Sequence, residues 1–220
     1  MKPTISIEDL RGRYLTAQLR GDRREALRIV LEDGLQQGFE ASELSDGVVR
    51  EAQREIGRLW QRNRIGIADE HMATAISHLV LAQLYQRAQH SPRNGKRVLV
   101  ACVEGERHEL PARLVADALD TAGFDVRFLG ADVPTDHLVR MVEEDPPDLL
   151  ALSATMSFHG SAVREAVRRL RQVRPAMPIA IGGGACEWAP GLADDVNADM
   201  TASSANDLVD SAKRLLGVAE

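Results

Sequence analysis

Three short polar segments of this sequence carry side chains that could bind a ligand or a metal. Each one follows an apolar run that predicts a buried strand. The segments are Glu106-x-His108, Ser153-x-Thr155 and the glycine run of Gly182, Gly183 and Gly184. A carboxylate two residues before a histidine can fix one imidazole nitrogen and raise the basicity of the other as a metal ligand. Hydroxyl groups can contact a polar ligand, and glycines let a ligand lie against the backbone.

The elements that must position these segments alternate strand and helix after residue 96. We predict strands at 97–103, 124–129, 148–153, 178–182 and 198–201, and helices at 109–122, 134–144, 159–173 and 204–217. This alternation is typical of an α/β domain with a doubly wound, flavodoxin-like (Rossmann) five-stranded parallel sheet. Because parallel strands end at one edge of the sheet, the three polar segments should meet in the crevice where such sheets bind ligands.

The first 90 residues contain apolar residues at helical spacing and no convincing strand. Breaks at Gly21, at Gly38 and over residues 63–68 divide them into four helices, which predicts a four-helix bundle with short connections. Ser42 or Ser45 could cap the third helix, and Asp69 should cap the fourth. Residues 87–96 are polar and mark a linker, so we expect domains at 1–90 and 97–220.

Composition limits the classes of protein that remain. The chain has 220 residues, of which 44% are hydrophobic and 27% charged, with a formal net charge of −6. This balance argues against a protein that coats nucleic acid, and no apolar run is long enough to cross a membrane. We expect a cytoplasmic protein without direct DNA binding. Cys102 should be a reduced, buried residue, and two cysteines make no metal site.

The order of the three polar segments resembles the cobalamin-binding Rossmann domain of methionine synthase, the mutases and the corrinoid proteins. That family has Asp-x-His-x-x-Gly, then Ser-x-Leu or Ser-x-Thr, then Gly-Gly. The resemblance implies that His108 is the lower axial cobalt ligand and that Glu106 is its hydrogen-bond partner. It also implies that Ser153, Thr155 and the three glycines receive the displaced nucleotide tail. Two residues depart from the family pattern. Glu106 stands where the pattern has Asp, and Pro111 stands where it has Gly.

The helical region resembles a particular branch of cobalamin proteins. Trp60 is followed after nine residues by Glu70 and His71, which is similar to the Trp-x9-Glu-His signature of the CarH/LitR-type adenosylcobalamin photoreceptors. The resemblance implies that the helical domain caps the upper face of the corrin, with Trp60 as a flat cover. Glu70 and His71 would then bind the adenosine. The alternative is a core tryptophan and a helix-opening acid.

One position departs from the photoreceptor pattern in a way that affects chemistry. Those proteins place a histidine directly after the tryptophan, and it binds cobalt after light releases the adenosyl group; here that residue is Gln61. Water, His71 or His159 could take the position instead, although His159 could equally be an exposed residue at a helix start. A linear tetrapyrrole is a second possible chromophore, bound without a covalent link.

These features predict a stand-alone light sensor that binds adenosylcobalamin and lacks the usual DNA-binding domain. Photolysis would change its conformation, its homo-oligomeric state or its affinity for a partner, either a transcription regulator or a signalling enzyme. The alternative is the corrinoid subunit of a methyltransferase system, which carries a methyl group on cobalt. A cobalamin carrier or storage protein is a third possibility. A preference for the adenosyl or the methyl ligand would discriminate the first two.

Overall fold

The structure, a computed structural model, describes residues 5–218. The chain divides into two compact units, one that ends at Gln89 and one that begins at His90. Among the described residues, no helix is both long and apolar enough to cross a membrane.

The first unit is entirely helical in its described part. Its helices are α1 (Ile7–Leu19), α2 (Arg23–Arg28), η1 (Ile29–Gly34), η2 (Leu35–Gln37), α3 (Ala41–Leu44), η3 (Ser45–Arg50), α4 (Glu51–Gln61) and α5 (Ile67–Tyr85). The segments from α2 to η2 follow one another without a break, as do those from α3 to α4. Together with α1 and α5 they form four helical stretches in the described part of the unit. Two segments, η1 and η3, are π-helical, which the sequence did not indicate.

The start of α5 differs from the prediction. The helix begins at Ile67 rather than after Asp69, and Gly66 is its N-cap residue. The Asp69 carboxylate accepts a hydrogen bond from the Gly66 N–H at 2.9 Å, so this acid closes the first turn from inside the helix. Glu70 and His71 therefore lie in and just after the first turn of α5.

The second unit contains a five-stranded parallel sheet with the order β2-β1-β3-β4-β5. The strands are β1 (Arg97–Cys102), β2 (Asp125–Phe128), β3 (Leu149–Ser153), β4 (Ile179–Gly182) and β5 (Met200–Thr201). The helices are α6 (Leu110–Thr121), α7 (Thr135–Glu144), η4 (Ser157–His159), α8 (Gly160–Val173), α9 (Gly184–Trp188), α10 (Leu192–Asp195) and α11 (Ala205–Leu216). The predicted fold class, with its flavodoxin-like sheet, is confirmed. Helices α9 and α10 are new, because runs of five and four residues are too short to show a helical period.

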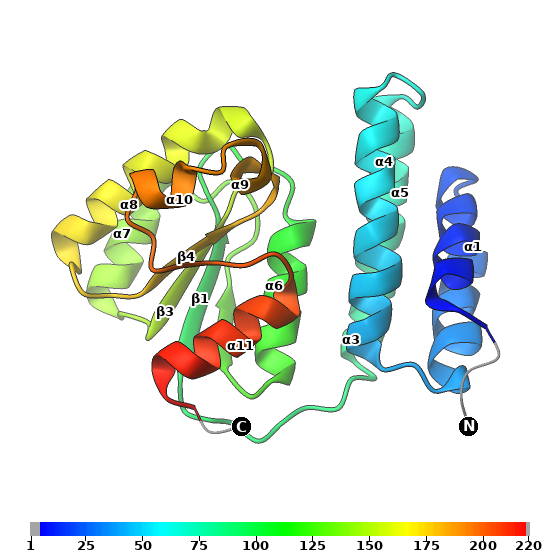
Figure 1. The fold of residues 1–220 in the computed structure, drawn as a ribbon, viewed down its shortest axis with the longest axis horizontal. Coiled ribbons are helices and arrows are strands. Elements are labelled where there is room, and N and C mark those ends of the chain that lie inside the picture. The colour runs from blue at the N-terminus through cyan, green and yellow to red at the C-terminus, as the bar shows by residue number, and fades with distance from the viewer. Residues whose placement is uncertain (1–4, 219–220) are drawn as a thin grey trace. The chain divides into compact units, whose positions relative to one another are not determined.

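Both faces of the sheet are covered, which explains why its strands read as continuous apolar runs. Alternate residues of β1 point to opposite faces. Val98 and Val100 belong to a core cluster with residues of α6 and α11, whereas Leu99 and Ala101 join residues of α7 and α8. Figure 1 shows these two helical layers on either side of the sheet. The parallel strands bring the loops after β1, β3 and β4 to one edge.

Candidate functional site

The loop after β1 holds Glu106 in a fixed, fully buried position. Its backbone N–H donates to the Val103 carbonyl at 3.0 Å. Gly105 has a φ of +84°, and its N–H donates to the Asp132 carboxylate at 2.7 Å. Helix α6 then begins with Pro111 in its first turn, where a missing N–H costs nothing. Pro111, which stands where the family pattern has glycine, therefore lies in the first turn of α6.

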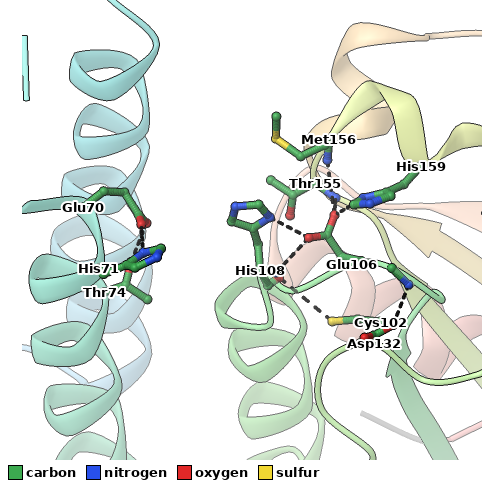
Figure 2. A network of polar contacts seen from close by, with 11 residues as sticks. Glu70, His71, Thr74, Cys102, Glu106, His108, Asp132, Thr155, Met156 and His159 are labelled. Carbon is green, nitrogen blue, oxygen red and sulfur yellow. Dashed lines mark hydrogen bonds and ion pairs between the residues drawn. The ribbon is translucent and has the colours of Figure 1, made fainter. Parts of the chain in front are cut away.

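The Glu106 carboxylate is the centre of the network shown in Figure 2. Its Oε1 accepts from the backbone N–H of His108 at 2.7 Å and from His108 Nδ1 at 2.6 Å. Its Oε2 accepts from the backbone N–H groups of Thr155 at 2.6 Å and Met156 at 3.3 Å, and from His159 Nδ1 at 2.8 Å. Burial by itself would raise the pKa of Glu106, but the hydrogen bonds from His108, Thr155 and His159 outweigh it and lower the pKa to about 2. Glu106 is therefore a buried carboxylate anion.

This anion determines the state of His108. Because a carboxylate only accepts hydrogen bonds, Nδ1 of His108 is the donor to Glu106 Oε1. The His108 side chain is 45% exposed, whereas that of Glu106 is 0% exposed. Such a pair, a partly exposed imidazole whose Nδ1 is held by a buried carboxylate, has the arrangement of a metal-binding histidine and its carboxylate partner.

His159 occupies a place that sequence reasoning did not identify. We expected either a ligand pointing into the crevice or an exposed residue, and the structure shows an imidazole that is only 12% exposed and hydrogen-bonded to Glu106. Its ring also makes an edge contact with Phe158, with centroids 4.4 Å apart. Two histidines from different loops thus share one carboxylate. No sequence pattern links positions 106 and 159, so only the fold could reveal this contact.

Two hydroxyl groups at and just after the end of β3 lie beside the end of β4 and make no hydrogen bond within the described chain. The hydroxyl oxygens of Ser153 and Thr155 are buried and have no hydrogen-bond partner. A methyl group added at Gly182 would meet no atom within 4 Å, so this glycine borders open space. Buried polar atoms without a partner are uncommon in native proteins, and here they indicate a place for a polar ligand.

The next two glycines serve the packing of the chain itself. A Cβ atom at Gly183 would lie 2.4 Å from the Ala154 carbonyl oxygen, and one at Gly184 would lie 2.7 Å from that of Thr155. Gly183 also has a φ of +93°. These two residues therefore hold the β3 and β4 loops together, which keeps Ser153 and Thr155 in place.

We expect Gly183→Ala to lower the free energy of unfolding by about 2–4 kcal/mol, since it combines an unfavourable φ with overlap against backbone. Chemical denaturation of the two variants would measure this. The control is Gly191→Ala, where φ is −81° and no atom lies within 4 Å, with an expected change within about 0.5 kcal/mol. Equal stability of both variants would contradict the packing role.

In the helical unit, Trp60 lies in the last turn of α4, and Glu70 and His71 lie at the start of α5. Hydrogen bonds connect this end to the core of the unit. In order along the chain of contacts, the members are Tyr14, Ser77, Gln53, Thr74, Glu70 and His71, with distances of 3.2, 3.0, 2.6, 2.8 and 2.6 Å. Both oxygens of Glu70 are used, one by the Thr74 hydroxyl and one by His71 Nδ1 (Figure 2). Glu70 is thus a structural partner of its neighbours.

Family models identify both units. Residues 96–210 match the model described as B12 binding domain, and residues 10–85 match a second model with the same description. The first match covers more than half of the chain. The chain belongs to the B12-binding domain family. It is a two-domain cobalamin-binding protein, and the predicted cobalamin binding is confirmed.

Individual relatives narrow the comparison. Dimethylamine corrinoid protein 1 of Methanosarcina acetivorans is 25% identical over 96% of this chain and 97% of its own length. Dimethylamine corrinoid protein 3 of Methanosarcina mazei is 33% identical over 52% of this chain and 68% of its own length. The structure of the Methanosarcina barkeri monomethylamine corrinoid protein has a TM-score of 0.79 at 18% identity, with 96% of this chain and 100% of that chain covered. The methanol:cobalamin methyltransferase complex of Methanosarcina barkeri has a TM-score of 0.51 at 20% identity, with coverages of 100% and 86%.

These relatives show that the prediction of a light sensor is wrong, and with it the assignment to light signalling and transcription regulation. The prediction depended on giving Glu70 and His71 to an adenosine. In the structure each oxygen of Glu70 accepts one hydrogen bond from this chain, and the finding that overturns the light sensor is the set of relatives. The relatives that span nearly the whole chain are corrinoid proteins named for dimethylamine.

The residues of the B12-binding unit fit a corrinoid that is held by one axial histidine. A corrin ring supplies four ligands to its cobalt, so one imidazole from the protein would suffice, and the partly exposed His108, held by Glu106, could supply it. The partnerless hydroxyls of Ser153 and Thr155, with the open space at Gly182, suit a polar tail. The residues present therefore match the group that the family binds.

Proposed function

We propose that this chain is the corrinoid protein of a methyltransferase system and carries a methyl group on cobalamin between partner enzymes. The observation that carries the proposal is the His108–Glu106 pair, a partly exposed imidazole held through Nδ1 by a buried carboxylate. The alignment of the chain, from end to end, with a dimethylamine corrinoid protein supports the same reading. The protein itself catalyses no reaction in this proposal, because separate methyltransferases load and remove the methyl group.

Each site residue then has a definite task. His108 would be the residue that holds the cobalt, and Glu106 would keep its imidazole in the required orientation. Ser153 and Thr155 would donate hydrogen bonds to the polar tail, for which Gly182 leaves space.

Cobalamin would supply a cobalt atom that can bind and release a methyl group. The chain supplies a fixed lower ligand and a buried place for the tail. Methylcobalamin is the form that this function requires, and no second chromophore is part of the proposal.

We expect the purified chain to retain methylcobalamin at least as well as adenosylcobalamin. The test is reconstitution in the dark with each form, followed by gel filtration and measurement of bound corrinoid from its absorption spectrum. Added cobalamin-dependent methyltransferase and a thiol acceptor should then remove the methyl group. Retention of adenosylcobalamin with loss of methylcobalamin during gel filtration would contradict the proposal.

A further inference from the structure

The loop after β2, residues 129–134, contains a residue in an unfavourable backbone conformation. Asp132 has a φ of +52°, in the left-handed region that residues other than glycine seldom adopt. Aspartate and asparagine tolerate this region better than other side chains, but the conformation still costs free energy. It persists only where surrounding contacts hold it, so the contacts of Asp132 indicate its role.

The carboxylate and the backbone N–H of Asp132 both contact the loop after β1, which carries His108. The carboxylate accepts from the Gly105 N–H at 2.7 Å, the dashed line at Asp132 in Figure 2. The Asp132 N–H donates to the Glu106 carbonyl at 2.8 Å. The two bonds hold the peptide group before Gly105 and the one after Glu106. They therefore fix the short segment from which the Glu106 side chain projects.

Other hydrogen bonds between the two loops act at neighbouring positions. The Glu104 carboxylate accepts from the Thr135 N–H at 3.0 Å, and the Val133 N–H donates to the Cys102 carbonyl at 3.3 Å. These bonds hold the start of α7 and the end of β1. Gly105 lies between them with a φ of +84°, and a glycine peptide rotates easily unless a partner holds it. Its partner is the Asp132 carboxylate.

We propose that Asp132 is a positioning residue that sets the direction of Glu106 and His108 by holding the backbone of Gly105 and Glu106 before the corrinoid binds. The inference rests on the proposed function, because it takes His108 as the ligand that the corrinoid needs. Apparent affinity falls in proportion to the fraction of chains in which a site is correctly formed. Asp132 raises the affinity for the corrinoid by keeping that fraction high.

Two substitutions separate the hydrogen bond from the backbone conformation. Asp132→Asn keeps a side-chain oxygen as acceptor and tolerates the left-handed φ, whereas Asp132→Gly adopts this φ without strain but has no acceptor. The matched control is Asn197→Gly, because Asn197 has a φ of +50° and precedes β5 at the opposite edge of the sheet.

The probe is methylcobalamin, titrated into each apoprotein. We expect Asp132→Gly to bind it about twofold to tenfold more weakly than the wild type, which is the effect of one hydrogen bond. Asp132→Asn and Asn197→Gly should bind methylcobalamin as the wild type does.

A measurement without corrinoid tests the same inference separately. In ¹⁵N-labelled apoprotein, the Gly105 amide and the His108 Nδ1 proton should exchange with water faster in Asp132→Gly than in the wild type, and Asp132→Asn should keep the slow exchange. The amides of β3 should exchange slowly in every variant, because the change is local and not a loss of global stability.

Unchanged exchange at Gly105 and His108 in Asp132→Gly, or wild-type affinity of this variant for methylcobalamin, would overturn the positioning role. The variant His108→Ala separates this failure from that of the proposed function. If His108→Ala binds methylcobalamin as the wild type does, the assignment of the ligand fails. The exchange measurement alone then decides whether Asp132 positions His108.

Discussion

His108→Ala should lose the protein ligand to cobalt and with it most of the affinity for cobalamin. Outer partners of metal-binding histidines typically contribute about 10- to 100-fold in affinity, so we expect the loss of the ligand itself to exceed that range. The absorption spectrum of the bound fraction should change to that of corrinoid without an imidazole below the cobalt. Equilibrium titration and the absorption spectrum measure the two effects.

The matched control is His137→Ala, which removes an exposed histidine on α7 of the same unit. It should bind cobalamin as the wild type does. Added free imidazole should restore part of the wild-type spectrum in His108→Ala, because a small base can enter the space that the side chain leaves. An unchanged spectrum in His108→Ala would remove the basis for the lower-ligand assignment.

Glu106→Gln should cause the largest loss of stability among single substitutions at the site. Glu106 is 0% exposed and accepts from donors on both oxygens. A glutamine must turn its NH₂ group toward one set of these donors, which leaves buried N–H groups without a partner. Breaking a buried hydrogen-bonded network of this kind costs about 3–5 kcal/mol, which denaturant unfolding of the apoprotein would measure.

The control for this variant is Glu165→Gln, which changes an exposed carboxylate paired with Arg168 at 2.7 Å. The hydrogen bond from Arg168 lowers the pKa of Glu165 as well, but water screens an exposed pair, so its contribution to stability is small. Equal losses of unfolding free energy in Glu106→Gln and Glu165→Gln would contradict a stabilising role of the buried network. Glu106→Asp should recover part of the loss, because it restores a carboxylate.

The same carboxylate predicts how stability depends on pH. Burial would raise the pKa of Glu106, but its hydrogen bonds lower it from the ordinary 4.5 to about 2 in the folded chain. Its stabilisation is therefore complete above pH 4.5 and is lost as the pH falls toward 2, a change of roughly 3 kcal/mol. The difference in unfolding free energy between the wild type and Glu106→Gln should narrow across this window. A constant difference would show that Glu106 is not ionised in the way described.

The sequence was informative where periodicity and order of elements determine structure. Continuous apolar runs predicted β1, β3 and β4, and the amphipathic segments between them predicted the helices that cover the sheet. Because parallel strands end together, the order of elements was enough to predict that Glu106, Ser153 and Gly182 belong to one edge. Cobalamin binding followed from the resemblance of these three segments to the cobalamin-binding Rossmann family.

The sequence was insufficient where a function depends on which hydrogen bonds are already made. In the sequence Glu70 is an acid next to a histidine, and only the structure shows that Thr74 and His71 each donate a hydrogen bond to one of its oxygens. For the same reason the sequence left His159 as either a ligand or an exposed residue, although it is a partner of a carboxylate 53 positions away. A short motif such as Trp-x9-Glu-His therefore resembled one branch of a family while the whole chain resembles another.

The most direct test of the central claim is electron paramagnetic resonance of the chain loaded with cob(II)alamin, prepared with natural and with ¹⁵N-labelled histidine. If His108 is the lower ligand, the nitrogen splitting of each cobalt line should change from a triplet to a doublet when the histidine is labelled. A triplet that remains with labelled histidine would mean that the base of the cobalamin itself binds the cobalt. That result would contradict the proposed site.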